Sequence, residues 1–273
     1  MIWPWQDRSG RFSPLKASVF TLLFAPGIWI IRQVQTGEFG AIPLAGMTYW
    51  SGVWATAILL LTLLVTPMGS ILRFGRLIVV RRMIGVAGLA YTIAHIFIYF
   101  ALRLWNFPSI AGEMATRPTL IIATVSTIGL AALGATSLDV AVRRMGDDWQ
   151  RLHNTVYVLT ALALVHFLLS PGIFSEQYLL TGMFFWLMVW RVLNRKGLGT
   201  NAGILAMLAI ATCLFTAFLE AAWIWVYQGF EPFGTLEQNF SLDLGISAAW
   251  RNLVAGLAVA LIAGVRRSAR SRG

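Results

Sequence analysis

Long apolar stretches run through most of this chain and constrain its fold more than any other feature. A helix that crosses a membrane needs roughly 20 predominantly apolar residues, and the 273 residues here are 58% hydrophobic. Eight stretches reach or approach that length: 15–34, 48–66, 84–104, 118–136, 152–169, 178–193, 204–227 and 249–265. The sixth is short, and the fifth begins in polar sequence. The sequence therefore predicts an all-α integral membrane protein with eight spans.

Basic residues are distributed unevenly between the segments that connect these spans. If the N-terminus lies in the cytoplasm, four of the 21 lysines and arginines fall on the outer side: Arg32, Arg103, Arg117 and Arg251. Short cytoplasmic loops retain positive charge in membrane proteins, so the pattern predicts a multi-pass protein with both termini in the cytoplasm. The same rule accounts for the net charge of +10. We therefore expect membrane lipid, and no nucleic acid, as a partner.

The sequence also argues against several kinds of cofactor site. Cys213 is the single cysteine, so no internal disulfide, structural zinc site or cysteine-ligated iron–sulfur cluster can form. Residues 197–203 resemble a dinucleotide fingerprint, but they have one residue too many before the third glycine and follow a span rather than a strand. Any reductant must then be a diffusible carrier or a separate protein. The N-terminus lacks the pattern of a removable signal peptide, so we expect the first span to direct insertion.

Three histidines, His95, His153 and His166, lie within or at the edge of predicted spans. Histidine in a bilayer is costly and usually faces the interior of a helix bundle. His95 follows Arg82 by 13 residues. His166 follows Arg151 by 15 residues, on a span that runs in the same direction. At about 1.5 Å per residue, both imidazoles lie roughly 20 Å from the cytoplasmic arginines, on parallel helices.

This matched depth suits the two axial ligands of one haem iron. Neutral imidazole is a common axial ligand, and bundle cores hold cofactors between facing helices. An iron with two imidazole ligands has no open coordination site, which suits electron transfer. The alternative is a pair of polar side chains that hydrogen-bond across helices. We predict that His95 and His166 are metal ligands.

His153 lies 13 residues before His166, and on a continuous helix the two would point about 140° apart. They share a face only if the helix bends or begins after His153. The same level of the third span offers Arg81 and Arg82, which can pair with haem propionates, a flavin phosphate or a lipid phosphate. We predict that all three residues contact a cofactor, with His153 as a third candidate metal ligand. An interfacial histidine without a cofactor is the alternative.

Four motifs add a family resemblance. They are Leu64-Val-Thr-Pro67, Arg81-Arg82-Met-Ile-Gly85 followed by His95, Thr116-Arg-Pro118, and Trp149-Gln-Arg-Leu-His153-Asn-Thr-Val-Tyr157 followed by His166. With these residues the chain resembles the MsrQ family of the ferric reductase-like transmembrane superfamily, over about residues 15–196. The resemblance implies a six-helix haem-binding core in residues 1–200. Residues 201–273 would then be a C-terminal extension with two further spans.

Members of this family carry b-type haem and are associated with FMN, so the resemblance implies both cofactors. It also implies a place in the bacterial inner membrane. There, electrons pass from the quinone pool or a cytoplasmic flavin reductase to a periplasmic molybdopterin-containing methionine sulfoxide reductase, which repairs oxidised proteins. The family's histidines carry over to His95, His153 and His166. Many superfamily members have two histidines in each ligand helix, whereas the third span here has one. We expect one haem, with two as the alternative.

Two classes of function remain, and the sequence leaves open whether the chain is an enzyme in its own right. The first is an electron-transfer subunit with no substrate site of its own. The second is the membrane subunit of a ferric-chelate or oxygen reductase that works with a separate flavoprotein. The missing nucleotide-binding domain favours the first. We expect electrons to enter near His153, Arg81 and Arg82 and to leave at the outer face. A smaller expectation is an ion pair between Glu220 and Arg251.

Overall fold

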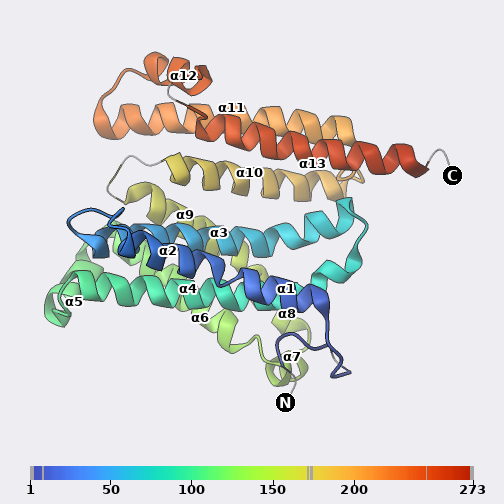
Figure 1. The fold of residues 1–273 in the computed structure, drawn as a ribbon, viewed down its shortest axis with the longest axis horizontal. Helices are drawn as coiled ribbons and strands as arrows, with labels where there is room; N and C mark the ends of the chain where they lie inside the picture. Colours follow the sequence, from blue (N-terminus) through green and yellow to red (C-terminus); the bar gives the residue numbers. More distant parts are fainter. Residues whose placement is uncertain (1–2, 8, 171, 173–174, 244, 271–273) are drawn as a thin grey trace. The chain divides into compact units, whose positions relative to one another are not determined.

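The computed structural model describes residues 3–7, 9–170, 172, 175–243 and 245–270 (Figure 1). Residues 267–270 are described as backbone only. The described residues form helices joined by short loops, and an isolated β-bridge between Gln6 and Phe12 is their one extended pairing. The elements are α1 (Pro14–Leu22), α2 (Ala25–Gln35), α3 (Pro43–Ile71), the 3-10 helix η1 (Gly75–Val80), α4 (Arg81–Leu102), α5 (Phe107–Thr116), α6 (Pro118–Ala135), α7 (Asp139–Met145), α8 (Asp147–Asn154), α9 (Val156–Leu169), α10 (Ser175–Arg195), α11 (Ala202–Gln228), α12 (Pro232–Phe240) and α13 (Ala248–Arg270). The predicted all-α fold is confirmed.

Seven helical segments in the described chain are long and apolar enough to cross a membrane. They are Pro14–Gln35, Pro43–Ile71, Gly75–Leu102, Pro118–Ala135, Asp147–Leu169, Ala202–Gln228 and Ala248–Arg266. They correspond to seven of the eight predicted spans. The remaining stretch, 178–193, lies within α10, a helix of 21 residues that includes Glu176, Arg191 and Arg195. A helix is therefore confirmed there, and its crossing of the membrane stays a prediction.

Two compact units divide the chain. The first comprises residues 1–62 and 79–170, and the second comprises 63–78 and 171–273. Helix α3 passes from one unit into the other between Thr62 and Leu63. By packing, α10 groups with α11, α12 and α13. The functional boundary near residue 200 that the sequence suggests stays a prediction.

Close packing of α6 against α9 forms the core of the first unit. Leu130 and Leu133 of α6 cluster with Leu159 of α9 and Leu59 of α3. A Cβ atom at Gly129 would lie 2.3 Å from a Leu159 methyl carbon, so a larger residue there would force the Leu159 side chain to move. Small residues at helix contacts are typical of membrane bundles because they let backbones come together. This contact positions α9, which bears His166.

The first predicted span is interrupted between α1 and α2. In a continuous helix the Leu23 carbonyl would accept from the Gly27 N–H. Instead the Tyr91 hydroxyl of α4 stands between them, donating to the Leu23 carbonyl and accepting from the Gly27 N–H, each at 2.9 Å. A side chain inserted into a helix ladder is a recognised cause of a kink. Tyr91 therefore satisfies both backbone groups that the interruption would leave unpaired.

In the second unit, an arginine replaces a backbone hydrogen bond that a proline removes. Pro67 lies inside α3 and has no N–H, so the Leu63 carbonyl four residues earlier loses its helical partner. Arg191 of α10 donates to that carbonyl at 2.9 Å and to the Leu187 carbonyl at 2.8 Å. Arg191, which lies in the predicted span 178–193, therefore supplies the hydrogen bond to the Leu63 carbonyl that Pro67 cannot.

Candidate functional site

His95, on α4, is held by the N-terminal part of α3. Its Nδ1 atom lies 2.9 Å from the Thr48 carbonyl oxygen and 3.1 Å from the Ser51 hydroxyl. A carbonyl oxygen can only accept, so the Nδ1–H donates and the neutral ring keeps its lone pair on Nε2. That tautomer is the one required to bind a metal through Nε2.

Gly52 fixes the position of the same ring. A Cβ atom there would lie 3.1 Å from His95 Cε1 and 3.2 Å from His95 Nδ1, closer than ordinary van der Waals contact. The imidazole therefore lies directly against the backbone of α3. Ser51, beside it, is 1% exposed and donates to the Thr48 carbonyl at 3.0 Å. The contacts that orient His95 therefore all come from one helix, α3.

His166, on α9, repeats this arrangement with a different pair of helices. Its Nδ1 atom lies 3.0 Å from the Thr119 carbonyl oxygen in the first turn of α6. Pro118 begins α6 and Arg117 precedes it, and proline is favoured at the first position of a helix. The orienting carbonyl therefore lies at a well-defined helix start.

His95 and His166 lie close enough to interact electrostatically. Both rings are half-buried, and both use Nδ1 to donate to a backbone carbonyl. Within the described part of the chain, neither Nε2 atom has a hydrogen-bond partner. Metal-binding histidines almost always donate their other ring N–H to a carbonyl, carboxylate or water. The pair fits a group that takes one imidazole from each of two helices.

His153 occupies a different position, at the end of α8. Its Nδ1 atom lies 3.1 Å from the Trp149 carbonyl oxygen, and its ring stacks on the Trp149 indole with centroids 3.9 Å apart. The indole Nε1 donates to the Thr136 carbonyl at 2.9 Å. The Nε2 atom of His153 is buried and makes no hydrogen bond of normal geometry to the described residues, although the Leu133 carbonyl also acts on the ring. This orphaned acceptor is what a cofactor contact at His153 would satisfy.

A break in the fifth predicted span separates the two histidines that it carries. Helix α8 ends at Asn154, and α9 begins at Val156. The interruption is one residue long: Thr155 keeps helical dihedral angles, and its N–H donates to the Leu152 carbonyl three residues back instead of four. A shared face for His153 and His166 stays a prediction.

The structure brings Arg81 and Arg82 close to His153. The charges of both arginines act on the imidazole. Arg82 also forms an exposed ion pair with Asp139 of α7 at 2.6 Å. Nothing in the spacing of Arg82 and Asp139 along the chain indicates this acidic partner. An anionic cofactor group held by Arg82 would have to share it with Asp139.

A second cluster joins α4 to α6 beyond the histidines. Glu113 of α5 accepts a hydrogen bond from Tyr99 at 3.0 Å and pairs with Arg103 and Arg117. Burial alone would raise the pKa of the Glu113 carboxyl, but the hydrogen bonds from Tyr99 and Arg103 hold that pKa below its usual value. Tyr99 follows His95 by one helical turn, and Arg117 precedes Thr119 by two residues. Glu113 therefore links the helix that carries His95 to the helix that orients His166.

The predicted ion pair between Glu220 and Arg251 is wrong. Arg251 instead lies 3.6 Å from Glu176 and donates to the Ser175 hydroxyl. Helix α10 begins at Ser175, which brings both residues beside the first turns of α13. The Oε2 atom of Glu220 has no hydrogen-bond partner in the described chain.

Fold and site together define a multi-pass helical membrane protein with a paired-histidine site. A family profile described as "Ferric reductase like transmembrane component" matches residues 51–164, which include His95 and His153 and end two residues before His166. The chain is 36% identical, over 165 residues, to a Cronobacter sakazakii protein named "Protein-methionine-sulfoxide reductase heme-binding subunit MsrQ". That alignment covers 60% of this chain and 82% of the relative. The chain belongs to the MsrQ family, as the sequence resemblance predicted. No solved structure shows significant similarity to it.

Proposed function

We propose that this chain is the haem-binding membrane subunit of a protein-methionine-sulfoxide reductase and that it carries electrons through the membrane. The name of the Cronobacter sakazakii relative supports the haem and the system to which it belongs. The observation that carries the proposal is the geometry of His95 and His166. Each has its Nδ1 held by a backbone carbonyl and its Nε2 available.

Within this proposal His95 and His166 hold the iron, and their neighbours orient them. A b-type haem bound there supplies a one-electron carrier. The carbonyl oxygens of Thr48 and Thr119 fix each ring in the Nδ1–H tautomer and increase the basicity of Nε2. Gly52 leaves room for the His95 ring against α3. We infer one haem at this pair.

In this proposal electrons cross the membrane from the cytoplasmic side to the periplasmic side. Electrons enter near His153, Arg81 and Arg82, from the quinone pool or a cytoplasmic flavin reductase, and FMN is bound on that side. The nearby guanidinium groups support a contact with an anionic cofactor there, and the Nε2 atom of His153 can accept from a hydrogen-bond donor or bind a metal. The acceptor is a periplasmic molybdopterin-containing methionine sulfoxide reductase. The uneven charge of the connecting segments supports an inner-membrane protein with both termini in the cytoplasm.

A ferric-chelate or oxygen reductase subunit is the second candidate. The description of the matching family profile favours it. Liposomes that contain the purified chain distinguish the two functions. A reduced flavin donor is confined to one side, and either the periplasmic reductase with methionine sulfoxide or a ferric chelate is placed on the other.

We expect the haem to be reduced from the side that carries Arg81 and Arg82 and to be reoxidised by the methionine sulfoxide system. Reoxidation by ferric chelate alone would favour the second function. Haem that accepts electrons only from the opposite side would contradict the proposed direction. Empty liposomes and liposomes with His95→Ala chain serve as controls for leakage.

A further inference from the structure

The Thr48 carbonyl oxygen lies within hydrogen-bond distance of two side-chain donors. The Ser51 hydroxyl oxygen is 3.0 Å from it, and the Nδ1 atom of His95 is 2.9 Å from it. Ser51 Oγ and His95 Nδ1 are themselves 3.1 Å apart, so the three atoms form a nearly equilateral triangle. A carbonyl oxygen can only accept. The imidazole N–H and the serine O–H therefore converge on one oxygen.

The other arrangement of protons in this triangle is unfavourable. If the Ser51 hydroxyl donated to an unprotonated Nδ1 of His95, the lone pair of Nδ1 would face the lone pairs of the Thr48 oxygen at 2.9 Å, with no proton between them. The ring proton would then lie on Nε2, the atom that would bind a metal. Ser51 and His95 therefore compete for the same acceptor.

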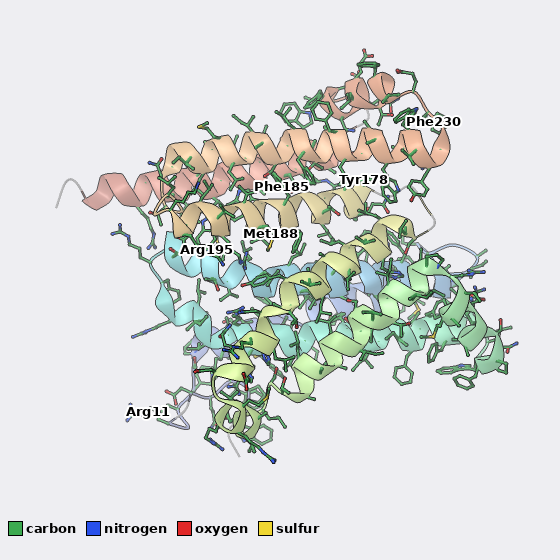
Figure 2. The ribbon with its side chains drawn as sticks, turned by 180° about the vertical axis from the view of Figure 1, so that it is seen from behind. Arg11, Tyr178, Phe185, Met188, Arg195 and Phe230 are labelled. Carbon is green, nitrogen blue, oxygen red and sulfur yellow. The ribbon has the colours of Figure 1, made fainter. Side chains whose placement is uncertain are left out.

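Helix packing holds Ser51 in this position. Figure 2 shows α4 beside the N-terminal part of α3. A Cβ atom at Gly52 of α3 would lie 3.1 Å from the His95 ring, and one at Gly88 of α4 would lie 3.1 Å from Leu59 of α3. Leu59 follows Gly52 by seven residues and Gly88 precedes His95 by seven, so the two helices pack antiparallel in a fixed register. Ser51 is buried in this contact, so bulk water does not reach its hydroxyl as an alternative partner.

His166 differs from His95 in this respect. In the described chain its Nδ1 atom has one oxygen within hydrogen-bond distance, the Thr119 carbonyl at 3.0 Å. An acceptor at Nδ1–H makes Nε2 a stronger donor to a metal, and hydrogen bonding around the axial ligands tunes the reduction potential of haem iron. Two donors on one oxygen weaken each other's hydrogen bonds, because each draws electron density from the same atom. Ser51 therefore weakens the hydrogen bond that His95 donates and leaves that of His166 unchanged.

We propose that Ser51 acts through His95 as a positioning residue that raises the reduction potential of the haem. Its hydroxyl weakens the hydrogen bond from His95 Nδ1 to the Thr48 carbonyl, so His95 Nε2 is a weaker donor to iron. Ferric iron carries one more positive charge than ferrous iron and is stabilised more by a strong donor. A weaker donor therefore favours the reduced state. The inference rests on the proposed function, because it requires haem at His95 and His166.

Redox titration of the haem-loaded chain, followed by visible absorbance, tests this role. Ser51→Ala removes the competing donor, so we expect a lower midpoint potential than in the wild type. The matched control is Ser126→Ala, because Ser126 of α6 is also buried and donates to a backbone carbonyl, that of Leu159 at 2.9 Å. The control should keep the wild-type potential. An unchanged or higher potential in Ser51→Ala, or an equal fall in Ser126→Ala, would overturn the proposal.

Nuclear magnetic resonance of the haem-free chain separates this inference from the haem assignment. The chain has three histidines, so isotope-labelled histidine gives few signals to assign. A stronger hydrogen bond moves the Nδ1–H proton signal to higher frequency. In Ser51→Ala we expect this shift for His95 and none for His166. A His95 signal that does not move contradicts the role of Ser51, whereas a chain that takes up no haem contradicts the proposed function.

Discussion

Replacement of Gly52 by alanine isolates the contact that positions His95. The new Cβ would lie 3.1 Å from His95 Cε1, so the ring must move by about 0.4 Å to reach ordinary contact. Without haem the ring can turn away. With haem it is held by the iron and by the 2.9 Å hydrogen bond to Thr48. Overpacking of this kind costs about 1–3 kcal/mol, which corresponds to a roughly 5- to 150-fold weaker dissociation constant.

Haem titration of the haem-free chain, followed by visible absorbance, measures this loss. The unfolding temperature of the haem-free Gly52→Ala protein should rise or stay unchanged, because alanine is favoured over glycine in a helix by about 0.5–1 kcal/mol. Gly69→Ala is the matched control on the same helix, since its nearest neighbour is the Phe74 carbonyl oxygen at 3.7 Å. Wild-type haem affinity in Gly52→Ala, or an equal loss in Gly69→Ala, would refute the reasoning.

Four further predictions concern stability and haem binding. Tyr91→Phe leaves a carbonyl and an N–H unpaired at the break in the first span and should cost about 1–3 kcal/mol in unfolding free energy. Arg191→Leu should cost a similar amount, and far less when Pro67→Ala restores the helical N–H. Because the pKa of Glu113 is depressed, its ion pairs stabilise the fold above the usual carboxyl pKa of 4.5 and lose that effect as the pH falls through the lowered value. A chain that ends at Lys196 should insert and bind haem, with reduced stability, because α10 loses the helices it packs against.

Each of these predictions has its own control. Chemical or thermal denaturation in detergent measures Tyr91→Phe, and unchanged stability would mean that water replaces the hydroxyl. Additive effects of Arg191→Leu and Pro67→Ala would show that the two residues are not coupled. The melting temperature of Glu113→Gln should vary less in acid than that of the wild type, and identical profiles would contradict the role of its ion pairs. A truncated chain that inserts without a haem spectrum would place part of the site beyond residue 200.

Hydropathy and residue spacing predict much of this protein. Seven of the eight predicted spans are confirmed as long apolar helices. An apolar stretch of about 20 residues indicates such a helix by its length alone, without any periodic pattern of buried residues. Depth along parallel helices also indicates that His95 and His166 lie near each other, and the structure shows that they interact.

Other features leave no trace in residue types. The acceptors that orient the histidines are the backbone carbonyls of Thr48 and Thr119, and any residue supplies a carbonyl. The break after Asn154 has neither glycine nor proline to mark it. The partner of Arg251 depends on where α10 begins, so the sequence alone could not distinguish Glu176 from Glu220 as that partner.

Electron paramagnetic resonance of the oxidised haem tests the central claim most directly. Two imidazole ligands give a low-spin ferric signal, and loss of one ligand gives a high-spin signal or loss of the haem. We predict a low-spin signal in the wild-type chain, its loss in both His95→Ala and His166→Ala, and its retention in His153→Ala. An unchanged low-spin signal in either of the first two variants would contradict the assignment of His95 and His166 as the axial pair.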